Sequence, residues 1–387
     1  MIERGVDKAP VSKQPVDNGG SRLRKFIGLP DECLLIVGPR RTPVVETPAQ
    51  NTNHSVAIST SVGFQQLATN EYQNFTDNVG SDVTVGLADL VKTFPASQKR
   101  LEKSADRTHA WTRDILAARE GHLSRRPLFA SIPPMEAHQQ SFYLSDLIDD
   151  YRSQISGVTT YAEDTAMIIP PELETFPRIC MIDPKSPHEI IRTVALGNDL
   201  VTVPFVNSTT ENGIAFDFSF EAPHQGQDNP MGFDLWNNSH ATATTPLVEG
   251  CQCYACTKHH RAFLHHLLNA KEMLAWTLLQ VHNLHVVSTM FVQIRDSITD
   301  GTFEQKSATF GRAYALDLPQ PTGEGPRIRG YHMKSVGRGE PRKNVKAYGR
   351  LDDQLMKLQE ADSGIATPEE ETRAGDLEKQ GLGTVQL

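Results

Sequence analysis

The residues best suited to chemistry in this chain are three cysteines and one histidine within a single stretch. Cys251, Cys253 and Cys256 follow one another as C-x-C-x-x-C, and His282 comes after twenty-five intervening residues. Three thiolates and one imidazole form the ligand set of a closed, four-coordinate structural zinc site. The spacing therefore predicts one tightly bound Zn²⁺ per chain, held by these four side chains.

Disulfide bonds and simple core packing are two other interpretations of the cysteines, and neither explains the cluster. Disulfides within so short a loop would be strained, and packing alone does not explain why three of the five cysteines cluster. The other two, Cys33 and Cys180, have no obvious partner, which indicates a reducing, intracellular compartment. The fourth ligand stays open at this point, because further histidines lie within reach along the chain. They are His259, His260, His265, His266 and His285.

A helix over about 270–299 would hold His282 rigidly while the cysteine loop folds back against it. Asn269 and Glu272 form a plausible N-cap and capping box, and apolar residues recur at helical spacing after them. This stripe consists of Leu274, Leu278, Val281, His285, Ser288, Phe291, Ile294 and Ile298, and a second surface beside it of Met273, Thr277, Leu284, Val287 and Met290. So much apolar surface predicts that the helix binds a partner protein; the alternative is that both surfaces pack within the chain's own core.

Composition and charge narrow the class of protein. The 387 residues carry a net charge of −9, which argues against a nucleic-acid-binding protein that acts through bulk positive charge. There is no apolar run of about eighteen residues that could span a membrane, and the N-terminus lacks a signal-peptide core. We therefore expect a cytoplasmic protein. One segment, 327–350, is rich in Lys and Arg with Glu340 as its single acid; it is either a solvated tail or a contact for RNA phosphates.

Apolar strand-like runs alternate with helix-like segments along most of the chain. Examples are the strand candidates 128–132, 178–182 and 200–203, and a helix that begins at Ser186 with Pro187 in its first turn. This alternation predicts an α/β fold with parallel strands. We expect 1–22 to be disordered, 23–314 to form the folded domain, and 315–387 to be a disordered, partly basic tail.

The stretch 251–282 and its flanking residues resemble the tRNA-guanine transglycosylases, or queuine tRNA-ribosyltransferases. The similarity is carried by PLVEGCQCYAC at 246–256, RAFLHHL at 261–267 and HNL at 282–284, and by RICMI at 178–182 and GNDL at 197–200 upstream. The resemblance extends over roughly 23–314. It implies a TIM (β/α)₈-type barrel with an inserted zinc subdomain, here 246–299. The barrel's first βα units have no counterpart, which implies an incomplete chain or a barrel open on one side.

The same resemblance implies a chemistry whose key groups are missing here. In the family an aspartate attacks the ribose C1′, guanine leaves, and an incoming base displaces the enzyme at the tRNA wobble position. Thr202 stands at the position of that nucleophile. The family's D-S-G-G-F-Q loop has only the superficial likeness SVGFQ at 61–65, and its Q-G-G segment is replaced by PPM at 133–135. No residue is therefore assigned a catalytic role.

These departures are the pattern of the family's non-catalytic accessory subunits. They imply a heterodimer with a catalytic queuine tRNA-ribosyltransferase subunit that exchanges guanine for queuine at position 34 of tRNA, and peripheral association with the mitochondrial outer membrane. Two alternatives stay open. The chain could be an active transglycosylase that uses another carboxylate, Asp199 or Asp217, or it could be a zinc-containing RNA-binding module.

Overall fold

The computed structural model describes residues 10–15, 20–40, 42, 50–60, 63–91, 95–119, 126–221 and 228–326. All of them belong to the first of two compact units, Met1–Glu340; the second, Pro341–Leu387, lies outside the described residues. The basic segment 327–350 and residues 61–62 of the SVGFQ segment also lie outside them. Within the described part, no helix is long and apolar enough to cross a membrane.

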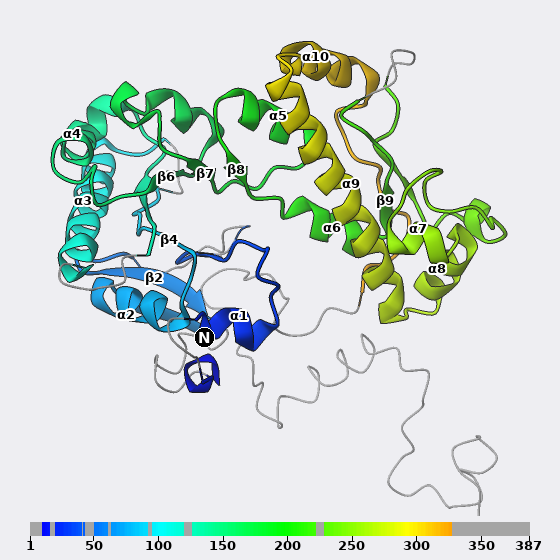
Figure 1. The fold of residues 1–387 in the computed structure, drawn as a ribbon, viewed down its shortest axis with the longest axis horizontal. Coiled ribbons are helices and arrows are strands. Elements are labelled where there is room, and N and C mark those ends of the chain that lie inside the picture. Colours follow the sequence, from blue (N-terminus) through cyan, green and yellow to red (C-terminus); the bar gives the residue numbers. More distant parts are fainter. Residues whose placement is uncertain are drawn as a thin grey trace, which may run out of the picture. The chain divides into compact units, whose positions relative to one another are not determined.

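The centre of the fold is a six-stranded parallel sheet with the strand order β1-β4-β5-β6-β7-β8 (Figure 1). Its strands are β1 (Ile36–Val37), β4 (Val83–Val85), β5 (Leu128–Ile132), β6 (Gly157–Thr160), β7 (Arg178–Cys180) and β8 (Leu200–Val201). Every residue of β4, β5 and β6 is buried, as expected for parallel strands covered on both faces. The α/β class with parallel strands is confirmed.

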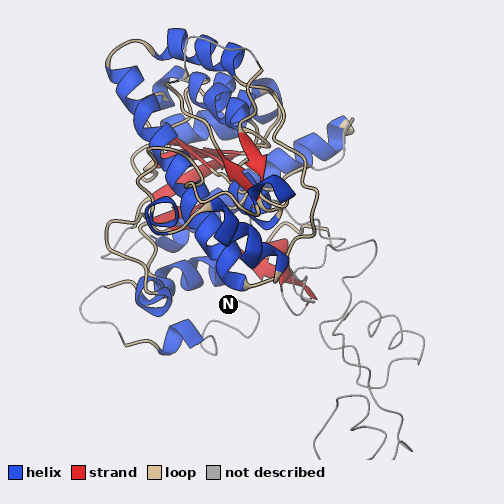
Figure 2. Cartoon of the chain, turned by 90° about the vertical axis from the view of Figure 1, so that its right-hand side faces the viewer, coloured by secondary structure: helices blue, strands red, loops and turns tan. Residues whose placement is uncertain are grey.

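Helices between successive strands cover the sheet (Figure 2). They are α2 (Thr69–Val79), α3 (Gln98–Arg119), α4 (Ser141–Asp149), α5 (Pro187–Ala195) and α6 (Phe205–Glu211). Helix α5 begins with Pro187 at its first position, as expected, although the Ser186 side chain makes no capping hydrogen bond. The antiparallel hairpin of β2 (Ser55–Thr60) and β3 (Gly63–Ala68) packs with α2, α3 and β5 around the buried Trp111.

The sheet is a half-barrel in the described part of the chain. Strand β1 pairs only with β4 and β8 only with β7, so each lies at an edge. The next strand, β9 (Ile214–Phe216), does not extend the parallel ladder, because it pairs antiparallel with β10 (Gly232–Asp234). The closed eight-stranded ring implied by the family resemblance is therefore not seen among the described residues.

The start of the chain packs against the β1 end of the sheet. Pro10–Lys13 form a 3₁₀ helix, and α1 (Arg22–Ile27) follows with Ser21 as its N-cap. Val11 is fully buried with Leu23, Leu35 and neighbouring side chains. These residues lie partly in the segment 1–22 that the sequence suggests is disordered.

The C-terminal part of the described chain is helical. It contains α7 (Tyr254–Lys258), α8 (Arg261–Asn269), α9 (Met273–Thr299) and α10 (Phe303–Ala313). The predicted long helix is present as α9, but the predicted N-cap is wrong. Asn269 is the last residue of α8, where its side chain donates to His265, and Glu272 occupies the N-cap position of α9. A tight turn at Lys271, with a positive φ of 54°, separates the two helices.

Beyond α10 the described chain runs back toward β10. The Thr322 backbone N–H donates to Asp234 Oδ2 at 3.0 Å, and the Lys271 ammonium pairs with Glu324 at 3.0 Å. Gly323 lies flat against the Trp236 indole, where a Cβ atom would come within 2.0 Å of the ring. Residues 315–326, which begin the predicted tail, thus contact β10, Trp236 and the turn between α8 and α9.

Candidate metal centre

Three local features bring the cysteines to one point. Gly250, with a φ of +76°, turns the chain into Cys251, and the Cys251 N–H donates to the Val248 carbonyl at 3.3 Å. Cys253 is the N-cap of α7, and its Sγ accepts a hydrogen bond from the Cys256 N–H at 3.3 Å. The side chains of Cys253 and Cys256 therefore lie on the same side of the chain, because the first turn of α7 brings Cys256 back over Cys253.

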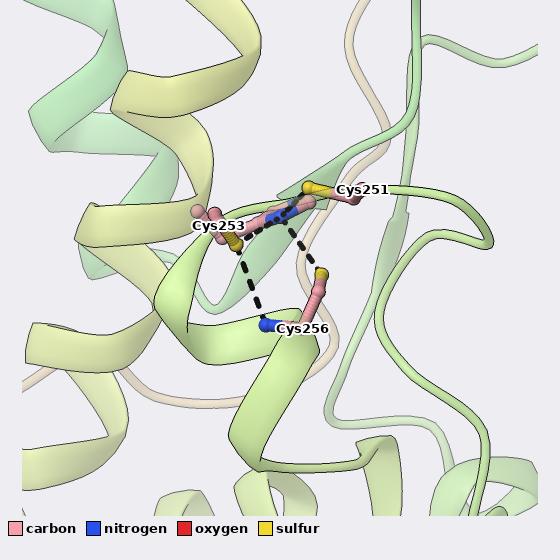
Figure 3. Close-up of side chains that lie close together, drawn as sticks. Cys251, Cys253 and Cys256 are labelled. Carbon is pink, nitrogen blue, oxygen red and sulfur yellow. Dashed lines mark hydrogen bonds between the residues drawn. The ribbon is translucent and has the colours of Figure 1, made fainter.

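His282 meets the three sulfur atoms from the middle of α9. Its Nδ1 lies 3.7 Å from Cys251 Sγ, 3.6 Å from Cys253 Sγ and 3.4 Å from Cys256 Sγ. All four potential ligand atoms lie within 4.8 Å of one another. Figure 3 shows the three cysteine side chains close together. Cys253, Cys256 and His282 are buried and Cys251 is half-buried. The structure thus assembles a Cys₃His group that could hold a metal ion, and it is the one such group among the described residues.

The other ring nitrogen of His282 fixes the orientation of the imidazole. Nε2 lies 2.8 Å from the Phe216 carbonyl oxygen in the buried strand β9, so it carries the proton and donates. Nδ1 is then the unprotonated nitrogen, and its lone pair points at the three sulfurs. A backbone carbonyl in this position is a typical outer partner of a metal-binding histidine.

Asn283, the residue after His282, holds that carbonyl in place. Its Oδ1 accepts from the Phe216 N–H at 2.9 Å, and its Nδ2 donates to the Ile214 carbonyl at 2.9 Å and to Thr210 Oγ1 at 3.0 Å. The Asn283 side chain is fully buried and therefore clamps β9 to α9. Sequence spacing alone did not identify this role, although the asparagine belongs to the HNL segment that carries the family resemblance.

Burial disfavours the charged forms of Cys251, Cys256 and His282. Burial raises the pKa of the Cys251 thiol, and burial together with the neighbouring thiolates raises the pKa of Cys256 to about 12. Burial also lowers the pKa of His282, which keeps the imidazole neutral. A divalent cation among the sulfurs would reverse the preference of the thiols, because it compensates their negative charge. The site therefore suits a cation, which would compensate the charge of the Cys251 and Cys256 thiolates.

The five alternative histidines do not join this group. His265 is buried, but its Nδ1 lies 2.7 Å from the Leu235 carbonyl and its Nε2 accepts from Asn269. His260 is the N-cap of α8 and accepts from the Phe263 N–H, and His259 stacks on the Phe263 ring. His266 is exposed and His285 is half-exposed on α9. Of the histidines considered, only His282 has a ring nitrogen near the three sulfurs.

Helix α9 has one buried and one exposed face beside the cluster. Val287 and Met290 belong to the apolar surface predicted to bind a partner, but they are 3% and 0% exposed and lie in the chain's own core, so that prediction is wrong for them. Exposed apolar side chains are instead Met273, Leu274, Val281, Leu284, Val292 and Ile298. Each of the two predicted apolar surfaces therefore has some residues in the core and others exposed to solvent.

The carboxyl end of β8 presents a hydroxyl that is already engaged. The Thr202 Oγ1 donates to the Ile182 carbonyl, and the Thr202 N–H donates to the Cys180 carbonyl at 3.2 Å. Asp199 lies at the opposite, amino end of β8, where its carboxylate accepts from the Arg178 N–H at 2.8 Å. Asp217 follows β9, and burial raises its pKa against the opposing effect of Arg261. Neither aspartate therefore stands at the Thr202 position.

Comparisons with known proteins agree with this geometry. The family model described as queuine tRNA-ribosyltransferase matches residues 10–316. The accessory subunit 2 of queuine tRNA-ribosyltransferase from Schizosaccharomyces pombe is 28% identical over 366 residues, covering 92% of this chain and 80% of that protein. The accessory subunit 2 of Aedes aegypti is 26% identical, covering 73% of this chain and 72% of that protein.

A bacterial relative carries the name of the enzyme itself. Queuine tRNA-ribosyltransferase of Dehalococcoides mccartyi is 29% identical over 284 residues, which covers 69% of this chain and 66% of that protein. The matched region of the family model includes the parallel sheet, the Cys₃His group and α9. This chain belongs to the queuine tRNA-ribosyltransferase family.

Proposed function

We propose that this chain is a non-catalytic accessory subunit of a queuine tRNA-ribosyltransferase. It would pair with a catalytic subunit that exchanges guanine for queuine at position 34 of tRNA. The observation that carries the proposal is Thr202, whose hydroxyl is engaged with a backbone carbonyl where a carboxylate nucleophile would be needed. Several relatives that cover most of the chain have the name accessory subunit 2, which supports the same assignment.

A threonine in this position cannot replace an aspartate. Covalent catalysis at a glycosidic carbon uses a carboxylate, which is ionised at neutral pH and forms a glycosyl–enzyme intermediate. A hydroxyl needs a neighbouring base to become nucleophilic, and the Thr202 hydroxyl instead donates its proton to the Ile182 carbonyl. Asp199 faces the other end of the sheet, so it does not supply the missing group.

The accessory role includes one structural zinc ion, held by Cys251, Cys253, Cys256 and His282. Ideal tetrahedral geometry with Zn–S of about 2.3 Å and Zn–N of about 2.05 Å places sulfur and nitrogen about 3.6 Å apart. The three observed Sγ–Nδ1 distances are 3.7, 3.6 and 3.4 Å, so the residues fit the ion. Zinc would supply cross-linking here: it ties the loop before α7 to the middle of α9, with four protein ligands and no open position for a substrate.

The exposed face of α9 supports a protein partner. The residues of this face follow one another at alternating steps of three and four: Leu274, Thr277, Val281, Leu284, Ser288, Phe291, Arg295 and Ile298. Phe291 among them is partly buried against the chain's own core. This spacing places them on one line along a helix, as in helices that pack against a partner helix. Leu274, Val281, Leu284 and Ile298 are between 39% and 53% exposed. We assign this face, the α9 seam, to the contact with the catalytic subunit.

The clustered cysteines also bear on the cellular location of the protein. Three clustered thiols remain available to a metal only in a reducing compartment, so we propose that the protein is cytoplasmic. Association with the mitochondrial outer membrane would then occur from the cytoplasmic side. Fluorescence microscopy of the tagged chain, with a mitochondrial outer-membrane marker, would test both statements.

The central experiment measures base exchange with the purified chain, the catalytic subunit and the mixture. Labelled guanine in tRNA is replaced by unlabelled queuine, and loss of label is followed with time. We expect no exchange with this chain alone and exchange in the mixture. Turnover by this chain alone, in proportion to its concentration and abolished by Asp217→Asn, would favour the active-enzyme alternative.

A further inference from the structure

A second polar cluster lies at the carboxyl ends of β1, β4 and β6, far along the chain from the Cys₃His group. Arg40 follows β1, Asp89 follows β4 and Tyr161 follows β6. In parallel α/β folds this edge of the sheet is where ligands bind, because the loops that follow the strands meet there. Helix α3 adds Arg100 and Arg107 to the cluster.

Asp89 is fully buried, and its hydrogen-bonding capacity is used. Oδ1 accepts from Arg100 at 2.7 Å and from Asn51 at 2.6 Å. Oδ2 accepts from Arg100 at 3.0 Å and from Arg107 at 3.0 Å. A carboxylate offers about four acceptor positions in total. Asp89 therefore has no acceptor left for another guanidinium group.

Arg40 lies near Tyr161 and Asp89 and has no acid of its own among the described residues. Its Nη2 donates to the carbonyl of Ala88, the residue before Asp89, at a long 3.3 Å. Its Nε is buried and makes no hydrogen bond. Burial lowers the pKa of Arg40, which the charge of Asp89 and the nearby Tyr161 only partly oppose. A largely buried guanidinium with an unused donor is costly unless something else binds it.

The charges in the cluster do not balance. Arg40, Arg100 and Arg107 bring three positive charges, and Asp89 is the one carboxylate that contacts them in the described part of the chain. Two positive charges are left over. The Arg107 side chain is 11% exposed and the Arg100 side chain is 36% exposed, so solvent reaches Arg100 but little of Arg107. The planar fork of an arginine side chain matches the oxygens of a phosphate group, and its charge-assisted hydrogen bonds are strong.

We propose that Arg40 is the anchor of a phosphate-binding site at the carboxyl edge of the parallel sheet. The ligand is a phosphate group, supplied either by the RNA backbone or by a free phosphate compound. Arg100 and Arg107 add attraction through their charge, while their own donors hold Asp89 and so fix the position of α3. The site is separate from the Cys₃His group and does not depend on the accessory role.

The test uses the full chain and inorganic phosphate at constant ionic strength, with chloride as the reference anion. Calorimetric titration gives the Kd, and the melting temperature is measured with and without phosphate. We expect Arg40→Gln to weaken phosphate binding at least about ten-fold, because it removes a charge-assisted hydrogen-bonding group. Arg40→Lys keeps the charge but not the planar guanidinium, so its Kd for phosphate should lie between those of the wild type and Arg40→Gln.

The melting temperature without phosphate separates a binding arginine from a structural one. Arg40→Gln removes an unpaired buried charge, so the variant should melt at the wild-type temperature or above while losing the gain that phosphate gives. Arg152→Gln, an exposed arginine on the surface, is the matched control and should respond to phosphate as the wild type does. Equal responses of wild type and Arg40→Gln to phosphate, or no response of the wild type, would overturn the proposal.

Unmodified tRNA distinguishes the two sources of the phosphate group. If the RNA backbone is the ligand, inorganic phosphate competes with tRNA and Arg40→Gln weakens tRNA binding while Arg152→Gln does not. If a free phosphate compound is the ligand, tRNA binding is the same in both variants and phosphate still binds the wild type. Either result identifies the source once the phosphate titration has established the site.

Discussion

The Cys₃His region and the carboxyl edge of the parallel sheet differ in how completely their polar groups are matched. Around His282, each nitrogen has a defined role: Nδ1 faces three sulfurs and Nε2 donates to a carbonyl that Asn283 holds in place. At the sheet edge, the Thr202 hydroxyl donates to a backbone carbonyl, and the buried Nε of Arg40 has no hydrogen-bond partner.

This difference separates the part of the family's architecture that supports structure from the part that performs chemistry. The geometry of the Cys₃His group is nearly symmetric about Nδ1, since the three Sγ–Nδ1 distances span only 3.4 to 3.7 Å. At the sheet edge the nucleophilic carboxylate is absent from the position of Thr202, and excess positive charge gathers near Arg40. A protein that keeps the first region and not the second can stabilise and position a partner without carrying out the reaction.

The largest expected effect comes from breaking the Cys₃His group. His282→Ala removes one ligand and the donor to Phe216, so we expect loss of zinc and a fall in the free energy of unfolding of more than about 4 kcal/mol. Zinc content by mass spectrometry and denaturant unfolding would measure both. His266→Ala, an exposed histidine in the same segment, should retain zinc and stability. Full zinc occupancy in His282→Ala would show that the ligand assignment is incorrect.

A smaller effect is expected on the exposed face of the same helix. Leu284→Glu places a charge in the α9 seam, and we expect it to weaken association with the catalytic subunit by about 2 kcal/mol or more, which is about thirty-fold in Kd. Folding of the isolated chain should be unchanged, because Leu284 is 46% exposed. Co-purification and analytical ultracentrifugation would measure association.

Two further variants sharpen this measurement. Met167→Glu makes a similar change at a side chain that is 73% exposed on another part of the surface, and it should leave association intact. Val287→Glu lies on the buried face of α9 and should unfold the chain instead of acting on the complex. Normal association of well-folded Leu284→Glu would place the partner contact outside the α9 seam.

The smallest effect is expected at the sheet edge. Thr202→Ala removes one hydrogen bond to the Ile182 carbonyl, which we expect to cost about 0.5–1.5 kcal/mol of stability. Base exchange by the assembled complex should stay within a few-fold of wild type, because no chemical step is assigned to Thr202. Thr202→Val, which keeps the shape of the side chain, serves as the control. Abolished exchange by an intact complex in both variants would contradict the accessory role.

Much of the local structure could be predicted from the sequence. The strand Leu128–Ile132 is present with the predicted bounds, the helix after Ser186 begins at Pro187, and the long helix ends at Thr299. Runs of apolar residues and proline in a first helical turn act over a few residues, so they are visible without the fold. The start of α9 was misplaced because Asn269 and Glu272 have the residue types of a capping box, whereas in the fold Asn269 closes α8 and binds His265.

The ligand types of the Cys₃His group can be read without the fold, since the spacing of three cysteines and the residue type at 282 are properties of the chain. Which of the six candidate histidines meets the sulfurs depends on the assembled fold, because the packing of α9 on β9 sets the position of His282. The assembled fold also decides which face of α9 is buried: Val287 and Leu284 are both apolar, and the sequence pattern does not distinguish them. The core around Val287 contains Phe205, Phe216 and Phe310, which are distant from it in sequence. The burial of Val287 is therefore a property of the assembled fold.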